Sequence, residues 1–386
     1  MTNSKKKVAI FIYSLGGGGA EKAALGLYEG LKADYEMFFV TVSPVTAYDT
    51  KGLNVTVLGE NDHKTSKLKK LFTTLKLFVA FIKFCRQNKI TAVVSFLSRP
   101  NIIAAMAKLF CKNLNVIATE HSTISKYYDD GFASKAFLFF LKTAYMLADK
   151  VVAVSKGIKD DLVQNIGVSD EKVEIVHNPL DIDTIALMSK EKLENRGDGF
   201  VFVTAGRLTE SKNYPFLFEA FKTLPDFCRL WILGDGELKS ELRFLAVESG
   251  IHERVKFFGF CQNPYKYFAA ADCFVSASKL EGLPTVLLEA MACGLPIVAT
   301  DCHSGPREIL GGDDEMLFSG IEKAEHGILV SLDTPMYLSL GMQKIIDEDV
   351  TRERYKESAK DGLKEFLPEV SISKYRNLIN FNKGSL

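Results

Sequence analysis

Residues 200–221 read FVFVTAGRLTESKNYPFLFEAF, and this stretch decides the fold that we predict. Phe200–Ala205 is a short β-rich apolar run, typical of a strand buried on both faces. A polar loop that begins with Gly206 and Arg207 follows this run. An apolar pattern at helical spacing begins soon after the loop. A buried strand followed by a helix is the repeating unit of a doubly wound parallel sheet.

The same alternation extends almost from one end of the chain to the other, and it restarts after the polar stretch Lys190–Gly199. We therefore predict an α/β protein with two Rossmann-like doubly wound domains facing across a cleft, at residues 1–190 and 191–368. Residues 369–386 are expected to form a helix that returns to the first domain. Strands are predicted at Val8–Tyr13, Phe38–Thr41, Val55–Leu58, Ala92–Ser95, Val116–Thr119, Val151–Val154, Phe200–Ala205, Leu230–Leu233, Val255–Phe258, Cys273–Ser276 and Pro296–Ala299.

Composition narrows the class of protein. The chain has 386 residues, and its Lys+Arg and Asp+Glu each total 48, so the bulk charge does not favour nucleic-acid binding. We expect no signal peptide, because no apolar core of about 15 residues follows the start Met1–Lys7. We expect no membrane span, because no stretch of about 18 apolar residues is present. The seven cysteines form no C-x-x-C pair. A disulfide framework and a zinc site are therefore not expected, and a cytoplasmic location fits.

A glycine run follows the first predicted strand. Gly16, Gly17, Gly18 and Gly19 precede a helix, where backbone N–H groups can approach an anion. A tight turn from strand to helix explains the run equally well. A P-loop is excluded because Glu21 stands where that motif needs glycine before its lysine. A dinucleotide-binding fold also needs glycine at the position of Glu21, and an acidic residue at the end of the second strand, where this chain has Val42-Ser43-Pro44. A dehydrogenase is therefore disfavoured.

The second domain carries two further patterns. Arg207 and Lys212 follow its first strand, and two cations at a strand's carboxyl end suit a diphosphate. Glu281 precedes a helix that Pro284 is well placed to begin, and Glu289 lies within that helix. Carboxylates accept hydrogen bonds from vicinal sugar hydroxyls. Taken singly, however, Glu281 is more simply a solvated loop residue and Glu289 a surface charge.

Together these patterns resemble a known family. The glycine loop, G-R-L-x4-K, Gly234-Asp235-Gly236-Glu237 and E-x7-E occur in this order. They are similar to the motifs of the retaining family 4 glycosyltransferases, which have the two-Rossmann GT-B fold. The resemblance covers nearly the whole chain. It implies a hexosyltransferase that uses a UDP-sugar and takes part in surface polysaccharide or glycan biosynthesis.

The resemblance also implies roles for individual residues. Arg207 and Lys212 would bind the diphosphate, Glu289 the ribose, and Glu281 the donor sugar. His121, at the end of a buried strand, is similar to the family's active-site histidine, whereas His177 matches a hinge segment and is taken as structural. Further donor contacts are expected from Gly16–Gly19, Phe260, Leu283, Pro284 and Thr285.

No cofactor and no metal are expected. Asp181 and Asp183 form a D-x-D pattern, which other glycosyltransferase folds use for manganese. Here the pattern lies far from the donor motifs. The family's same-face mechanism needs neither a protein nucleophile nor the paired carboxylates of glycosidases.

The segment from Lys64 to Lys89 contains eight Lys/Arg and no acidic residue. On a helical wheel Lys69, Lys76 and Lys83 form one stripe, which Leu77, Phe81 and Phe84 flank. A helix that covers the sheet and exposes a solvated basic face is one interpretation. The other is a peripheral enzyme on the anionic inner face of the cytoplasmic membrane, whose acceptor is a glycan on a polyprenyl diphosphate. The apolar helix expected over Phe132–Leu147 is assigned to core packing.

Donor identity rests on a weaker signal. The segment Ser304–Ile309 resembles one in family members that often transfer N-acetylhexosamines, so UDP-N-acetylgalactosamine or UDP-N-acetylglucosamine is favoured. The segment is alternatively a turn and helix cap. Two rival functions stay open: an acceptor-independent UDP-sugar epimerase and a non-catalytic UDP-sugar-binding partner of another transferase.

Overall fold

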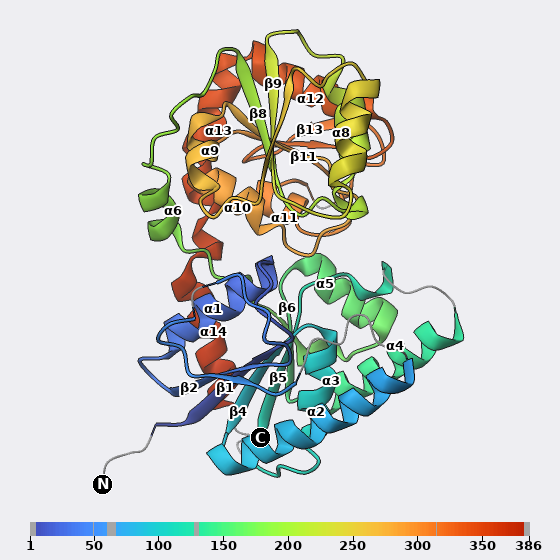
Figure 1. The fold of residues 1–386 in the computed structure, drawn as a ribbon, viewed down its shortest axis with the longest axis vertical. Helices are drawn as coiled ribbons and strands as arrows, with labels where there is room; N and C mark the ends of the chain where they lie inside the picture. Colours follow the sequence, from blue (N-terminus) through green and yellow to red (C-terminus); the bar gives the residue numbers. More distant parts are fainter. Residues whose placement is uncertain (1–4, 49, 60–66, 127–130, 314, 382–386) are drawn as a thin grey trace. The chain divides into compact units, whose positions relative to one another are not determined.

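The computed structural model describes residues 5–48, 50–59, 67–126, 131–313 and 315–381, without the side chains of residues 67–72, 132 and 133. The chain forms two compact units. The first consists of Met1–Pro179 and Pro368–Leu386, and the second of Leu180–Leu367. Each unit contains one sheet flanked by helices (Figure 1). No helix among the described residues is long and apolar enough to cross a membrane.

The first unit is built on a seven-stranded sheet in the order β3-β2-β1-β4-β5-β6-β7, and all of its paired strands are parallel. The carboxyl ends of parallel strands meet at one edge of a sheet, where ligands bind in such folds. The strands are β1 (Lys7–Ile12), β2 (Glu36–Thr41), β3 (Val55–Val57), β4 (Ala92–Phe96), β5 (Asn115–Glu120), β6 (Lys150–Ala153) and β7 (Val173–Ile175). The helices are α1 (Gly19–Leu31), α2 (Lys67–Asn88), α3 (Ser98–Ala107), α4 (Phe132–Leu147), α5 (Lys156–Asp160) and α14 (Pro368–Asn380).

Alternate residues of β1 pack on opposite faces of this sheet. Ile10 belongs to a core cluster that includes residues of α1 and α14. Phe11 instead stacks on Phe81 of α2, with their ring centroids 4.3 Å apart. Because neighbouring residues of a strand face opposite sides, strands buried on both faces appear in the sequence as continuous apolar runs.

The second unit contains the other seven-stranded sheet, in the order β10-β9-β8-β11-β12-β14-β13, and only the edge pair β13–β14 is antiparallel. Its strands are β8 (Phe200–Ala205), β9 (Cys228–Leu233), β10 (Val255–Gly259), β11 (Cys273–Ser276), β12 (Ile297–Thr300), β13 (Ile321–Lys323) and β14 (Ile328–Val330). Its helices are α6 (Ile182–Met188), α7 (Tyr214–Phe221), α8 (Lys239–Glu248), α9 (Tyr265–Ala270), α10 (Thr285–Ala292), α11 (Pro306–Leu310), α12 (Pro335–Asp347) and α13 (Asp349–Gly362).

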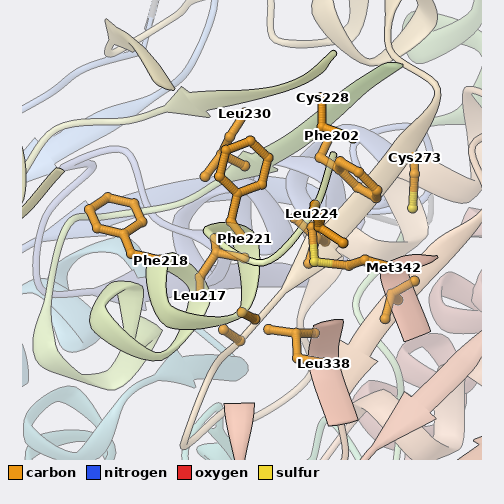
Figure 2. Close-up of a cluster of buried hydrophobic side chains, with 14 of the residues drawn as sticks. Phe202, Leu217, Phe218, Phe221, Leu224, Cys228, Leu230, Cys273, Leu338 and Met342 are labelled. Atoms are coloured by element: carbon orange, nitrogen blue, oxygen red, sulfur yellow. The ribbon is translucent and has the colours of Figure 1, made fainter. Parts of the chain in front are cut away.

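A continuous apolar core fills one face of the second sheet. Figure 2 shows Leu217, Phe218 and Phe221 of α7 among side chains of the sheet and of α12. Phe218 and Phe221 are fully buried. Burying a large apolar side chain contributes roughly 1.5–3 kcal/mol, so α7 is held firmly against the sheet. The loop between β8 and α7, which contains Arg207 and Lys212, is thereby anchored at both ends.

The predicted fold class is confirmed, and every predicted strand is present within a few residues of its expected bounds. The prediction missed β7, β13 and β14. Each has only three residues, and so short a run gives only a weak signal of periodicity. We expected the first domain to end at residue 190, but α6 contacts α9 and α10 of the second unit.

The C-terminal helix α14 lies in the first unit, as predicted. The Asn115 amide donates to the carbonyl of Leu378 over 2.9 Å. The Ser371 hydroxyl donates to the carbonyl of His177 over 2.8 Å. Since His177 is buried and its carbonyl is bonded to α14, its main chain serves to hold this helix in place.

Candidate active site

The second sheet has a topological switch point between β8 and β11. These strands are neighbours, and the order β10-β9-β8 continues on one side while β12 follows on the other. Loops at such a point diverge and leave room for a ligand. Lys212 follows β8 and Glu281 follows β11, and Lys212 Nζ lies 2.5 Å from Glu281 Oε1. The fold therefore brings together two of the predicted site residues that are far apart in the chain.

This ion pair is partly shielded from water, since the Lys212 and Glu281 side chains are 22% and 12% exposed. Charges at this depth need a partner, because removal from water disfavours the charged form. Tyr214 and Cys302 lie near the Glu281 carboxylate. Burial, together with the charge of Glu281, raises the pKa of both groups. Tyr214 and Cys302 are therefore neutral, and the local charge is that of Lys212 and Glu281.

Glycines allow three loops to stack at the carboxyl edge of this sheet. Gly234 has φ +134°, and a side-chain carbon there would overlap the carbonyl oxygen of Gly206. The amide of Leu208 donates to Asp235 O over 3.0 Å. The amide of Gly234 donates to Gly259 O over 2.7 Å. The loops after β8, β9 and β10 are thus joined through their main chains.

Arg207 occupies the exposed side of this stack. Its side chain is exposed, and no hydrogen bond or ion pair of its guanidinium is found among the described residues. The side chain of Lys212 passes close to Gly206, where an added carbon would lie 3.1 Å from Lys212 Cε. Both cations therefore belong to one loop, with Lys212 bound to a carboxylate and Arg207 open to a ligand.

The helix α10 begins as predicted. Pro284 is its N-cap and Thr285 its first residue, and Gly294 follows its end with φ +76°. Glu289 lies in the second turn and is only 6% exposed, which excludes a surface charge. Leu283 is buried beside the N-cap, whereas Phe260, just after β10, is 62% exposed.

The segment Ser304–Ile309 supports the loop before α10. The Ser304 hydroxyl donates to Gly282 O over 2.8 Å. Gly305 has φ +92°, and a side-chain carbon there would overlap the ring of Pro284. Arg307 forms ion pairs with Asp301 at 2.5 Å and with Glu322 at 2.8 Å. These contacts fit the turn-and-cap interpretation of the segment, because the guanidinium of Arg307 is bound within the protein.

In the first unit, the glycine loop follows β1, which is itself at a switch point beside β4. Gly18 is the N-cap of α1, and Gly17 has φ +98°. The Glu21 carboxylate folds back toward Gly18. A carboxylate near the helix start occupies the position that an anionic ligand would take. Phosphate binding at this loop would require Glu21 to move.

His121 follows β5 at the same edge of the first sheet. Its ring stacks on Phe96 with centroids 5.2 Å apart, and its Nε2 lies 3.1 Å from Thr119 Oγ1. Desolvation lowers the pKa of His121 to about 3. The ring is therefore neutral at physiological pH.

Sequence reasoning missed Glu120, which is fully buried beside His121. Its Oε1 accepts from the amides of His121 and Ser122 and from the Ser122 hydroxyl, and its Oε2 from Ser98 and Tyr145. Burial raises the pKa of Glu120, and these hydrogen bonds oppose that effect. Glu120 fixes the turn that carries His121. The only signal in the sequence was its position next to His121.

Comparisons with known proteins show the family of the chain. Residues 17–184 match the family described as Glycosyltransferase Family 4, and residues 188–362 match Glycosyl transferases group 1. A Campylobacter jejuni relative, named N-acetylgalactosamine-N,N'-diacetylbacillosaminyl-diphospho-undecaprenol 4-alpha-N-acetylgalactosaminyltransferase, is 34% identical over 94% of this chain and 96% of its own. The chain is a family 4 glycosyltransferase.

Solved structures agree on the fold of this glycosyltransferase. Anabaena Alr3699/HepE in complex with UDP has a TM-score of 0.79 at 19% identity, covering 96% of this chain and 98% of its own. The lipopolysaccharide outer core galactosyltransferase WaaB in its apo form has a TM-score of 0.70 at 19% identity, covering 97% and 99%. The fold is therefore GT-B.

The D-x-D pattern of the glycosyltransferase has a structural explanation. Asp181 is the N-cap of α6, where its Oδ1 accepts from the Thr184 amide over 3.0 Å and its Oδ2 from the Thr184 hydroxyl over 2.6 Å. Asp183 is exposed in the first turn of α6. An acidic residue at a helix N-cap satisfies free amides and needs no metal for its presence to be explained.

We expected Leu77, Phe81 and Phe84 to flank the basic stripe of α2, and this expectation is wrong. Leu77, Phe81 and Phe84 are buried against the sheet, because residues at i, i+4 and i+7 share one helix face. The apolar residues Leu75 and Val79 are exposed instead, 54% and 63%. Lys76 and Lys83 are exposed as expected. The side chain of Lys69 lies outside the described residues.

Replacement of Lys212 by alanine tests the diphosphate site. We expect Lys212→Ala to lower kcat/KM about 10²–10³-fold, because one preorganised charge at the site of developing negative charge is lost. Lys222→Ala is the matched control, since Lys222 pairs with Glu219 on the exposed surface of the same unit. Initial-rate kinetics give the measurement.

Fluorescence of Trp231, the single tryptophan of the chain, reports whether the second unit stays folded in both variants. Equal rates for Lys212→Ala, Lys222→Ala and the wild-type enzyme would contradict the assigned role of Lys212.

Proposed function

We propose that this glycosyltransferase moves an N-acetylhexosamine from UDP to a hydroxyl of a glycan carried on a polyprenyl diphosphate, with retention of configuration. The ion pair of Lys212 with Glu281 at the β8–β11 switch point carries the donor part of this proposal. The name of the Campylobacter jejuni relative supports N-acetylgalactosamine as the transferred sugar and a diphospho-undecaprenol glycan as the acceptor.

In the proposed complex the two cations of the loop after β8 bind the diphosphate. Arg207 is exposed and makes no described side-chain bond, so it can bind two phosphate oxygens at once. Lys212 lies within the same loop and contributes a point charge. The main-chain amides of Leu283 and Thr285, at the start of α10, add hydrogen-bond donors. The helix dipole favours negative charge at this end of the helix.

The remaining site residues bind the nucleoside and the sugar. Glu289 on α10 accepts the ribose hydroxyls, and the ring of Phe260, which is exposed, packs against the base. Glu281 faces the transferred sugar while it holds Lys212. His121 contacts a polar group of the same sugar during turnover. The amides of Gly16–Gly19 approach the phosphates once Glu21 has moved away from the loop.

Electrostatic stabilisation of the departing UDP is the proposed source of catalysis. As the bond between sugar and phosphate lengthens, negative charge grows on the β-phosphate and positive charge on the anomeric carbon. Arg207 and Lys212 stabilise the former, an effect that is usually the largest single contribution to catalysis. The acceptor hydroxyl attacks from the side that UDP leaves, and the departing phosphate takes its proton. The bond to UDP breaks as the new glycosidic bond forms, so no protein nucleophile is needed.

We assign the binding of the acceptor and of the membrane surface to α2, α3 and α4 of the first unit. The sequences of α2, α3 and α4 contain no acidic residue, although each contains Lys or Arg. Large apolar side chains are exposed on or just after these helices: Leu75, Val79, Met106, Leu109, Phe110, Phe139, Phe140 and Met146. Core packing therefore does not account for all of α4. Basic and apolar side chains together fit an anionic lipid surface.

We accordingly propose a peripheral location on the inner face of the cytoplasmic membrane. Lys76 and Lys83 are exposed on α2 and free to approach lipid phosphates or the diphosphate of the acceptor. On the helical wheel, Lys69 belongs to the same basic stripe as Lys76 and Lys83. The charge of these residues draws the enzyme to the surface that holds its lipid-linked acceptor.

A transfer assay tests the proposed reaction. The enzyme is given UDP-N-acetylgalactosamine, UDP-N-acetylglucosamine, UDP-galactose or UDP-glucose, with and without an undecaprenyl-diphosphate-linked N-acetylhexosamine in detergent. We expect UDP release that depends on the acceptor and is at least tenfold faster with the N-acetylated donors. The new linkage should keep the anomeric configuration of the donor by NMR. Isomerised UDP-sugar without acceptor, or an inverted linkage, would contradict the proposal.

Vesicle flotation tests the membrane surface independently of turnover. We expect the enzyme to float with vesicles that contain phosphatidylglycerol and to stay behind with pure phosphatidylcholine. Lys76→Glu/Lys83→Glu should weaken binding at least tenfold, because each basic residue near an anionic surface contributes about 1 kcal/mol. Phe139→Ser/Phe140→Ser should also weaken it, through lost apolar contact.

The control variants are Lys192→Glu and Phe244→Ser, which change exposed residues of the second unit. Equal flotation of all variants, or no preference for the anionic vesicles, would overturn the assignment of the membrane surface to α2–α4.

A further inference from the structure

The hydrogen bonds around His121 determine which ring nitrogen carries its proton. His121 Nε2 lies 3.1 Å from Thr119 Oγ1. Either atom could supply the hydrogen if the pair stood alone, because a neutral imidazole has one protonated and one unprotonated nitrogen. The second bond of the Thr119 hydroxyl removes this ambiguity.

Thr119 Oγ1 also lies 2.9 Å from the main-chain carbonyl oxygen of Ser95. A carbonyl can only accept, so the Thr119 hydroxyl donates its single hydrogen to Ser95 O. Toward His121 it can then only accept. Nε2 must therefore be protonated, and Nδ1 of the neutral ring presents a lone pair.

We propose that Thr119 is a positioning residue that holds His121 in the tautomer protonated at Nε2, so that Nδ1 accepts a hydrogen bond from the donor sugar. This inference rests on the proposed function, in which His121 contacts that sugar. It adds a requirement on the chemistry of the sugar. The group opposite Nδ1 must be a hydrogen-bond donor, which is either a sugar hydroxyl or an N-acetyl N–H. A ring with the other tautomer would instead select an acceptor such as a carbonyl.

The surroundings of Thr119 leave its hydroxyl little freedom to turn. Thr119, Ser95 and Asn101 are all completely buried. Asn101 Nδ2 donates to the carbonyl of Thr119 over 2.9 Å, and the Ser95 hydroxyl donates to Asn101 Oδ1 over 2.7 Å. Rotating the Thr119 hydroxyl toward His121 would leave the carbonyl of Ser95 without this bond, which is costly in a buried site.

The ring of His121 is fixed as well as its proton. Its plane stacks on Phe96 at 26°, and Phe96 is buried. Its main-chain amide donates to Glu120 Oε1 over 3.0 Å. The Glu120 carboxylate thus bonds the main chain of His121, and the bond that sets the ring tautomer comes from Thr119. Among the described residues no hydrogen bond of Nδ1 is found, so this atom is available to a ligand.

The test measures the tautomer directly in the full-length protein labelled with ¹⁵N-histidine. Long-range ¹H–¹⁵N correlation spectra distinguish a protonated ring nitrogen from an unprotonated one, and the signal lost in His121→Gln assigns the residue. We expect the wild-type His121 to be protonated at Nε2. Thr119→Val keeps the shape but removes the acceptor, and it should give a mixture of tautomers. Thr119→Ser should restore the wild-type spectrum.

Ser95→Ala is the matched control. It removes a hydroxyl that is equally buried and in the same network, but it keeps the Ser95 carbonyl that receives the Thr119 hydrogen, so the tautomer should not change. A wild-type ring protonated at Nδ1 would overturn the proposal even if a variant failed to fold. A Thr119→Val spectrum identical to wild type would overturn it too.

Kinetics separate this inference from the proposed function. We expect Thr119→Val to lower kcat about tenfold and Thr119→Ser to stay within threefold of wild type. If the tautomer follows Thr119 as expected but His121→Gln turns over at the wild-type rate, the proposed contact of His121 with the sugar fails while the positioning role of Thr119 stands. If His121→Gln is inactive but the tautomer ignores Thr119, the positioning role fails alone.

Discussion

The ion pair between Lys212 and Glu281 is the interaction on which the rest of the proposed donor site depends. It joins the loop after β8 to the loop after β11 at the topological switch point of the second sheet, where the connections of these two neighbouring strands diverge. An ammonium and a carboxylate that are both partly shielded from water stabilise each other. In the proposed complex with a nucleotide diphosphate, the lysine contacts both anions, while Arg207 in the same loop supplies a second cation.

Rigid main-chain contacts make this arrangement possible. Gly234 and Gly236 let the loop after β9 approach the loop after β8 more closely than side chains would allow. In the first unit the same purpose is served by buried polar side chains: Glu120 fixes a turn through five hydrogen bonds, and Thr119 fixes the proton of the neighbouring imidazole. Each unit thus holds its candidate site residues at the carboxyl edge of its parallel strands, with geometry set before any ligand arrives.

Sequence reasoning predicted the fold class and the main strands, because strands buried on both faces are apolar throughout and are punctuated by glycine loops. It also predicted the start of α10 from Pro284 and that Lys212 and Glu281 belong to one site. It failed where a helix has two apolar faces: on α2 the buried face is that of Phe81, and Leu75 and Val79 are exposed. It missed Glu120 because a buried carboxylate satisfied by scattered donors leaves no pattern in the chain.

Calorimetric titration of UDP and of uridine tests most directly whether the cations of the second unit bind the diphosphate. The wild-type enzyme should bind UDP at least 100-fold more tightly than uridine, and Arg207→Ala/Lys212→Ala should lose most of that difference while its affinity for uridine stays the same, since each charged contact to a phosphate is worth roughly 1.5–3 kcal/mol. A double variant that still prefers UDP as strongly as the wild type would show that the diphosphate binds elsewhere.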